Sequence, residues 1–160
     1  MTIWNRFPYE IRWAGPEDWA ETMDMIWRTF LRFEAQDYTE EGVSNFRDFI
    51  TDDRLYDMFL NGNYPMMVAL DQEKIIGQIS VRNGNHISLL FVEEAYHNKG
   101  IGRELVKRMA AYLKKDRKAL FMTVQAAPYA VGFYRKVGFR ASSPEEEYSG
   151  IRVTSMEKFL

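Results

Sequence analysis

Two glycines, Gly100 and Gly102, lie where a run of strand-forming residues gives way to a run with helical spacing. The first backbone N–H groups of a helix have no partner inside it, and the helix dipole is positive at that end, so such a turn can bind a phosphate group. Glycine lets the backbone come close to the phosphate. The same pair also suits an ordinary strand-to-helix turn, so the spacing alone leaves both interpretations open.

The residues after the glycines exclude two common phosphate-binding motifs. A P-loop needs a lysine followed by serine or threonine after its last glycine, where this chain has Arg103 and Glu104. A dinucleotide-binding fingerprint needs a further glycine, where this chain has Leu105. The turn also follows a series of expected antiparallel strands, which is not the position of a first Rossmann unit.

The segment LLFVEEAYHNKGIG resembles the pyrophosphate loop of the GNAT superfamily of N-acetyltransferases, whose pattern is Gln/Arg-x-x-Gly-x-Gly/Ala after the fourth strand. A second segment, VQAAPYAVGFYRKVGF, is similar to the family's fifth strand, the helix that follows it and a terminal Lys-x-Gly-Phe. The resemblance covers residues 64–159, and the first 60 residues match only in their order of a strand and two helices. It implies acetyl-CoA as co-substrate and an amine as acceptor.

The resemblance implies roles for several groups in the chain. In the family the fourth and fifth strands splay apart to admit the pantetheine arm, so Leu90, Phe91 and Val92 would offer strand backbone to that arm and to the thioester carbonyl. Phe133 would line the thioester channel, and Tyr134 matches the tyrosine that protonates the departing thiolate. The residues expected around the pyrophosphate are His97, Lys99, Gly100, Ile101, Gly102 and Arg103.

Two positions depart from the family pattern. His97 stands where the family usually has glutamine or arginine, and Ala127 stands where an asparagine or serine is common. His97 keeps a backbone N–H, so phosphate binding should survive the change. Ala127 cannot give a side-chain hydrogen bond to the cofactor, and Gln125 is the expected substitute.

Acyl transfer from a thioester to an amine needs a neutral nucleophile, a polarised carbonyl oxygen and a proton for the thiolate, whose pKa is roughly 8.5. A phenol with a pKa of about 10 can supply that proton, which suits Tyr134 as general acid, although a core tyrosine would give the same pattern. A strand N–H at Leu90 or Val92 would polarise the carbonyl in the manner of an oxyanion hole.

The general base is left open among several groups. His86 is the leading candidate because the pKa of a free imidazole is roughly 6.5, although a histidine at a strand end is more often a surface residue. The rival bases or substrate anchors are Glu34, Asp37, Glu93 and Glu94. The early helices are acidic and aromatic, which makes a cationic amine a plausible acceptor, whether a small molecule, an amino acid or a peptide.

The periodicity predicts the elements that hold these residues. Apolar residues recur at helical spacing as far as Glu34, Thr39 can cap a second helix, and a shorter helical piece is expected at residues 53–60. Strands with period two precede and follow these helices, and after them come a helix from Gly100, a strand, a helix from Pro128 and a last strand.

The order of these elements predicts a mixed α/β fold. We expect a mostly antiparallel central sheet of about six or seven strands, flanked by about four helices, in a single domain over residues 1–160. The chain has no cysteine and only two histidines, so a disulfide framework, thiolate chemistry and a metal site are not expected.

The start of the chain is too polar for a signal peptide, and no apolar run approaches the roughly 18 residues that span a membrane. We therefore expect a soluble cytoplasmic protein with no membrane partner. Residues 1–60 hold 6 basic and 13 acidic side chains, whereas residues 61–160 hold 15 basic and 10 acidic ones, so the second half suits an anion.

Other classes of function compete with the enzyme. A nucleic-acid binder would interleave aromatic residues with its basic ones, and the basic helix after Gly100 offers only Tyr112. We therefore do not expect a nucleic-acid partner. The main alternative is a non-catalytic module that binds acyl-CoA as a sensor or partner. A homodimer is a further possibility, because dimers are common among proteins similar to this one.

Overall fold

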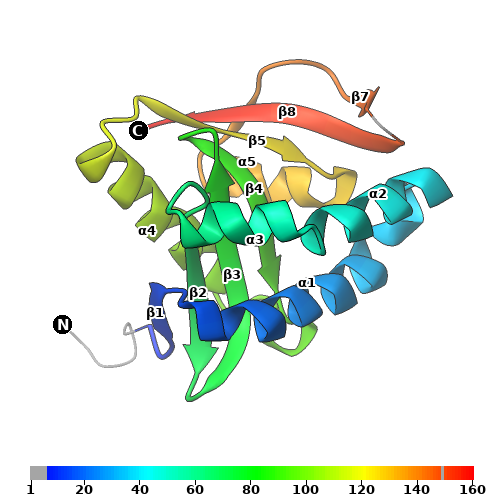
Figure 1. The fold of residues 1–160 in the computed structure, drawn as a ribbon. Helices are drawn as coiled ribbons and strands as arrows, with labels where there is room; N and C mark the ends of the chain where they lie inside the picture. The colour runs from blue at the N-terminus through cyan, green and yellow to red at the C-terminus, as the bar shows by residue number, and fades with distance from the viewer. Residues whose placement is uncertain (1–6, 149) are drawn as a thin grey trace.

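The computed structural model describes residues 7–148 and 150–160, and its centre is a sheet of eight strands (Figure 1). The strands are β1 (Glu10–Trp13), β2 (Met66–Asp71), β3 (Lys74–Arg82), β4 (His86–Val92), β5 (Phe121–Ala126), β6 (Arg140–Ala141), β7 (Glu146–Tyr148) and β8 (Ile151–Phe159). Their order across the sheet is β1-β2-β3-β4-β5-β8-β6, and β7 pairs with β8. The β4–β5 pair is parallel and the others are antiparallel. The expected mixed α/β fold with a mostly antiparallel sheet is confirmed.

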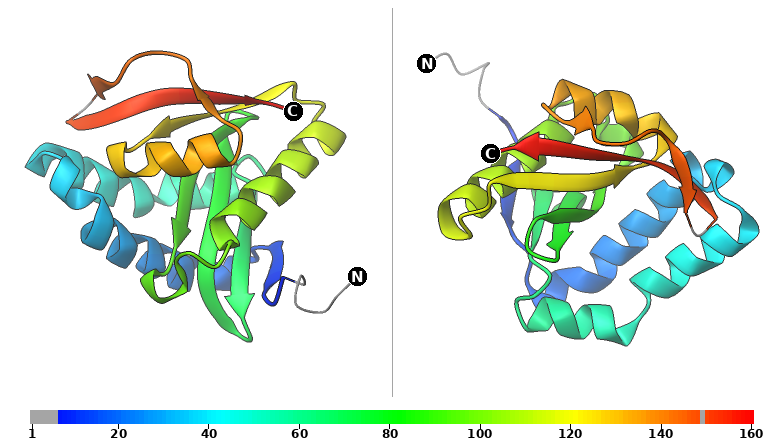
Figure 2. Two further views of the ribbon diagram at one scale, coloured as in Figure 1. Left: turned by 180° about the vertical axis from the view of Figure 1, so that it is seen from behind. Right: turned by 90° about the horizontal axis from the view of Figure 1, so that it is seen from above.

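Five α-helices occur in the described residues: α1 (Trp19–Phe33), α2 (Glu40–Ile50), α3 (Asp53–Leu60), α4 (Ile101–Asp116) and α5 (Val131–Lys136). Four short 3-10 turns join them to the rest: η2 (Pro16–Asp18), η3 (Ala35–Asp37), η4 (Glu94–Tyr96) and η5 (Pro128–Ala130). The helices α1, α2 and α3 cover one face of the sheet, and α4 and α5 cover the other (Figure 2). No helix in the described part of the chain has both the length and the apolar character needed to cross a membrane.

Local signals account for several element boundaries. The Thr39 hydroxyl accepts a hydrogen bond from the Gly42 N–H at 3.0 Å and caps α2, as predicted. Gly138 follows α5 with a φ of 102°, which closes the helix because the Phe139 N–H can then donate to the Tyr134 carbonyl at 2.9 Å. The strands β6 and β7 were not expected, since segments of two and three residues are too short to display an alternation.

An ion pair between the partly exposed Arg12 and the buried Asp18 fixes the start of α1. Arg12 donates two hydrogen bonds to Asp18, at 2.7 and 3.1 Å, and the Gly15 N–H donates a third at 2.7 Å. Asp18 is 7% exposed, and the hydrogen bonds from Arg12 hold the pKa of its carboxyl below the ordinary value. We expect Asp18→Asn to lower the free energy of unfolding by about 2 kcal/mol at pH 7, because charge-assisted bonds are lost.

Urea unfolding measures this loss, with Glu17→Gln on the exposed neighbour as control. A depressed carboxyl pKa stabilises the fold above the unfolded pKa, and that contribution disappears as the pH falls through the folded one. The unfolding free energies of Asp18→Asn and Glu17→Gln should therefore become equal at acid pH. A difference between them that persisted at pH 2 would contradict this account.

The sheet opens between β4 and β5. In the described chain the two strands pair only at His86 with Thr123 and at Ile87 with Val124. Beyond that point β5 continues to pair with β8 as far as Ala126, while β4 continues to pair with β3 as far as its end. The remaining residues of β4 therefore present a backbone edge that no strand covers, which confirms the expected splay.

A β-bulge lies next to this opening. The register of β3 and β4 leaves Ser88 unpaired between Ile87 and Leu89. The buried Tyr64 hydroxyl donates to the Ser88 hydroxyl at 2.7 Å and accepts from the Ser80 hydroxyl at 3.0 Å. This small network holds the bulge in place, and so fixes the direction in which the rest of β4 runs.

Candidate active site

Two cavities share the opening between β4 and β5. The α4 cavity, about 620 Å³, lies between the open part of β4, the turn before α4, the first turn of α4, and α5. The α2 cavity, about 230 Å³, is lined by α2, the ends of α1 and β3, and parts of β4, β5 and β8. The residues that line both are Leu90, Phe91, Tyr129, Ala130 and Tyr134. The opening thus joins the two faces of the sheet.

The start of α4 supplies an anion site in the α4 cavity. Gly100 has a φ of 81°, and its carbonyl accepts the first helical bond, from Glu104 N–H at 3.0 Å. The N–H groups of the intervening residues, Ile101, Gly102 and Arg103, have no acceptor inside the helix. All three residues line the cavity, together with His97 and the basic Lys136, whereas Lys99 is not part of the lining.

The open edge of β4 presents backbone groups to the same cavity. Glu93 N–H donates to the Ile76 carbonyl at 2.8 Å and Phe91 N–H to the Gln78 side chain at 3.1 Å, both on the β3 side. Because backbone groups alternate along a strand, the N–H groups of Leu90 and Val92 point toward the opening. These two N–H groups are the ones expected from the sequence to polarise a carbonyl.

His97 contributes its side chain as well as its backbone. Its Nε2 lies 2.7 Å from the Val92 carbonyl oxygen, so this nitrogen carries the proton and donates it. The imidazole also lies 4.9 Å from the Phe33 ring, centroid to centroid. His97 thereby ties the phosphate-binding turn to the end of β4, a role that the sequence did not indicate.

Tyr134 lies at the junction of the two cavities. Its side chain is buried, and its hydroxyl has no hydrogen-bond partner among the residues that the structure describes. Burial, followed by the negative charge of Glu34, raises the pKa of Tyr134 above its ordinary value of 10. The phenol therefore keeps its proton, and a molecule in the opening can receive it.

Glu34, at the end of α1, is the carboxylate that faces the α2 cavity. It is 9% exposed, and the Tyr129 hydroxyl lies 3.4 Å from its Oε2 and donates to it. Burial is the main reason that the pKa of Glu34 is raised to about 7, with a smaller contribution from the charge of Asp37. Near neutral pH this carboxyl can therefore both take up and release a proton.

The other candidate carboxylates are engaged by arginines. Glu93 pairs with Arg28 at 3.0 Å and Glu94 with Arg32 at 3.5 Å, which joins α1 to the η4 turn. Asp37 pairs with Arg152 of β8 at 3.7 Å. Of the four carboxylates considered from the sequence, Glu34 alone has no ion pair within residues 7–148 and 150–160.

His86 lies at the closed end of the opening, where β4 still pairs with β5. Its Nδ1 is 2.8 Å from the Thr123 hydroxyl, and burial, followed by the charge of Arg82, lowers the pKa of His86 to about 4. The strand rise places it about 12 Å from Leu90 along β4. His86 and Gln125 both line the α2 cavity and not the α4 cavity.

An unpaired strand edge beside an anion-binding helix end suits a long thioester carrier that ends in a phosphate group. The fold and the two cavities thus have the features expected of an acyltransferase that uses a coenzyme A thioester. The family model described as "Acetyltransferase (GNAT) domain" matches residues 34–160. The chain therefore belongs to the GNAT family of acetyltransferases.

Several solved structures of N-acetyltransferases have a fold similar to that of this chain. A GCN5-related N-acetyltransferase from Rhodopseudomonas palustris is 27% identical, with a TM-score of 0.80 over 94% of this chain and 95% of that chain. The PaiA N-acetyltransferase from Thermoplasma acidophilum, solved with coenzyme A, is 20% identical, with a TM-score of 0.81 over 95% of this chain and 99% of that one. A spermidine N-acetyltransferase chimera from Vibrio cholerae is 16% identical, with a TM-score of 0.68 over 95% of each chain.

Gly102 sets the distance between α4 and α5. A Cβ added at this position would lie 3.1 Å from two ring atoms of Phe133, which is tighter than ordinary contact. We expect Gly102→Val to weaken acetyl-CoA binding about tenfold or more, because the displaced ring would enter the cavity and overpacking of this kind costs roughly 1–3 kcal/mol.

Calorimetric titration with acetyl-CoA measures the effect of Gly102→Val. The control is Gly132→Ala on α5, where an added Cβ would meet nothing within 4 Å. Equal affinities for the two variants would mean that the close packing at Gly102 does not shape the binding site.

Proposed function

We propose that the protein transfers an acetyl group from acetyl-CoA to a primary amine by direct attack in a ternary complex, with residues 1–160 acting as one domain. The observation that carries the proposal is that the α4 and α2 cavities share the residues around the Tyr134 hydroxyl. Acetyl-CoA entering from one face of the sheet and an amine entering from the other would therefore meet there.

The proposed cofactor site follows the α4 cavity. The pyrophosphate would accept hydrogen bonds from the N–H groups at the start of α4, with Lys99 and His97 nearby. The pantetheine arm would pair with the open edge of β4 at Leu90, Phe91 and Val92, beside the Phe133 ring. The residues proposed for the phosphate turn are His97, Lys99, Gly100, Ile101, Gly102 and Arg103.

In the proposed reaction, the N–H of Leu90 or Val92 stabilises the developing oxyanion as the amine attacks the thioester carbonyl. The C–S bond then breaks, and the Tyr134 hydroxyl donates its proton to the departing thiolate. The proton that the acylated nitrogen loses returns to Tyr134, directly or through water. Tyr134 is protonated at neutral pH, since its pKa is raised from an ordinary value of 10. The products are the N-acetyl amine and coenzyme A.

For the general base we propose Glu34 in place of His86. A base acts best when its pKa lies near the working pH, and the pKa of Glu34 is about 7, against about 4 for His86. Glu34 also bonds to Tyr129, which lines both cavities, whereas His86 lies toward the closed end of the opening. Glu34 would take the proton from the ammonium group, directly or through water.

The proposed amine remains a class and not a compound. One structural relative is named as a spermidine N-acetyltransferase, but at 16% identity that likeness concerns the fold. Gln125, which lines the α2 cavity, would then contact the acceptor and not the cofactor. The cytoplasmic location and the homodimer stay predictions.

The experiment that tests the proposal is the release of free thiol from acetyl-CoA with a panel of small amines, amino acids and peptides. Turnover with at least one amine, and formation of its N-acetyl product by mass spectrometry, is the expected result. Tight binding of acetyl-CoA without release across the panel would favour the non-catalytic acyl-CoA-binding module.

A further inference from the structure

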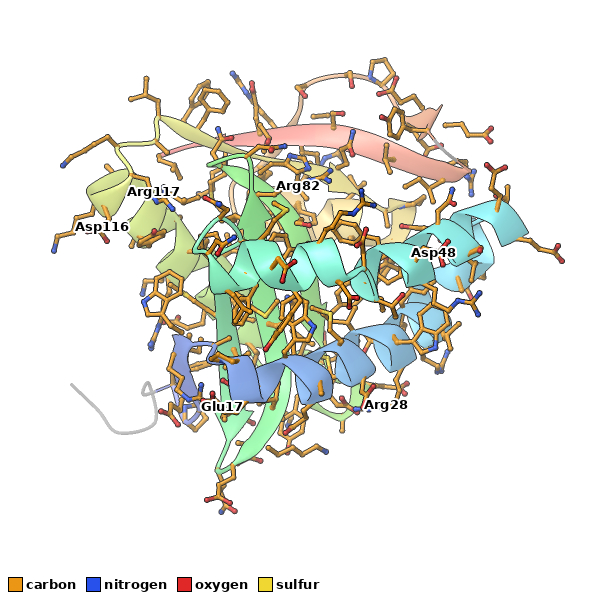
Figure 3. The ribbon with its side chains drawn as sticks, viewed as in Figure 1. Glu17, Arg28, Asp48, Arg82, Asp116 and Arg117 are labelled. Carbon is orange, nitrogen blue, oxygen red and sulfur yellow. The ribbon has the colours of Figure 1, made fainter. Side chains whose placement is uncertain are left out.

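Arg82 ends β3 and reaches into the α2 cavity. It pairs with His86 across the β3–β4 turn, and both residues line the cavity. In Figure 3, Arg82 is labelled above α3, below the place where β5 and β8 cross the view. It is therefore a cationic side chain on the acceptor side of the sheet, at the closed end of the opening.

Part of the Arg82 guanidinium group is buried without a partner. Its Nε is buried and makes no hydrogen bond, and Arg82 forms no ion pair, within the residues that the structure describes. A guanidinium has five N–H donors and does not lose its charge, so a buried one is stabilised by an anion. Carboxylates suit its planar fork because they accept two parallel hydrogen bonds.

The groups around Arg82 are uncharged. His86 lies opposite Arg82, and Ser88 and Gln125 also line the cavity. His86 is neutral because burial and the charge of Arg82 lower its pKa to about 4. Glu34 is the carboxylate in the lining, and it bonds to Tyr129 beyond the end of β5. The cavity thus carries a proton acceptor toward Tyr134 and an unpaired cation toward His86.

We propose that Arg82 binds a carboxylate of the acceptor, so that the substrate is an amino acid whose amine lies toward Glu34. This inference rests on the proposed acetyltransferase function and names its substrate class. The cavity volume of about 230 Å³ suits a small molecule that carries both the amine and the carboxylate. A polyamine, which offers only cations, would place positive charge against Arg82.

Matched acceptors test this assignment. Each free amino acid, for example L-lysine or L-methionine, is compared with its carboxamide and with its decarboxylated amine by thiol release. The carboxamide has the same size as the amino acid, and its amine is less basic, so a larger fraction of it is in the neutral, reactive form. A preference for the amino acid over its carboxamide therefore shows that the carboxylate is recognised. We expect kcat/KM to favour the amino acid at least tenfold in at least one such set.

Substitution of Arg82 assigns the preference to that side chain. Arg82→Gln should raise KM for the preferred amino acid about 100-fold, with a much smaller change in kcat and none in acetyl-CoA affinity, since a buried charge pair typically contributes this much to binding. The amide should be used equally by wild type and variant, and Arg82→Lys should recover part of the loss. The control is Arg117→Gln, an exposed arginine at the far end of α4.

Several outcomes would overturn the assignment. Equal or better use of the amide or the decarboxylated amine by the wild type would do so, as would an equal loss on acid and amide in Arg82→Gln. If no amine gives thiol release, the transferase proposal fails on that result alone. Calorimetric binding of the same acid and amide to the protein saturated with coenzyme A then tests Arg82, and equal affinities would refute its role.

Discussion

Replacing Tyr134 with phenylalanine is expected to lower kcat about 100- to 10,000-fold, the range usual for the loss of a general acid. The ring would still pack between Phe133 and Phe139, whose centroids both lie 5.2 Å away, so the cavity keeps its shape. Only the proton for the departing thiolate is removed. The affinity for acetyl-CoA should therefore stay within about twofold of the wild type.

Thiol release under saturating substrate measures kcat, and calorimetry measures the affinity. Tyr56→Phe on α3 is the matched control, since it removes a hydroxyl from a ring that packs against Trp19 outside both cavities. Activity that survived in Tyr134→Phe would exclude the phenol as the acid. A parallel loss of acetyl-CoA binding would instead make Tyr134 a structural residue.

Replacing Glu34 with glutamine is expected to have an effect of similar size, and one that depends on pH. The base must be ionised, so kcat/KM of the wild type should rise with pH and level off above about 7, the pKa of this carboxyl. In Glu34→Gln, kcat/KM at pH 8 should be about 100-fold or more below that of the wild type. The rise of kcat/KM with pH up to about 7 should also disappear. The matched control is Glu93→Gln, which removes a carboxylate that is paired with Arg28.

The same substitution should stabilise the fold at high pH. Between 4.5, the ordinary pKa of the group, and about 7, folded Glu34 holds a proton that the unfolded chain has released. This stabilising contribution is complete below pH 4.5 and is lost as the pH rises through 7, where a buried charge remains. At pH 8 we expect Glu34→Gln to have a free energy of unfolding in urea about 3 kcal/mol higher than that of the wild type. If the difference in unfolding free energy between Glu34→Gln and the wild type were the same at pH 5 and at pH 8, the raised pKa of Glu34 would be contradicted.

Much of the fold could be predicted from the sequence because local patterns specify it. Thr39 caps α2 as expected, and the alternation of the strands from 64 to 92 is clear enough to give the meander. The turn before α4 could be predicted because its backbone adopts a φ of 81° at Gly100, a conformation that favours glycine and so is visible in the sequence. The short strands β6 and β7 depend on pairing with β8, which is a contact between distant segments.

The candidate site was predicted less completely, since its chemistry depends on burial. The sequence placed His86 ahead of Glu34 as the base, whereas we propose Glu34, because burial moves the pKa values of the two groups in opposite directions. Arg82 gave no signal, since an arginine before a hairpin turn is most often exposed. The bond from His97 to Val92 joins residues whose side-chain geometry no local pattern specifies.

The uncovered edge of β4 has a consequence for the protein's behaviour among other chains. An unpaired edge at the rim of a sheet invites strands of neighbouring molecules and so promotes aggregation. Here the edge lies inside the sheet, between β4 and β5, with helices over both faces (Figure 2). A strand of another molecule would have to displace the elements that surround this edge before it could pair with it. The fold thereby offers backbone recognition to a ligand while it denies the same surface to its own copies.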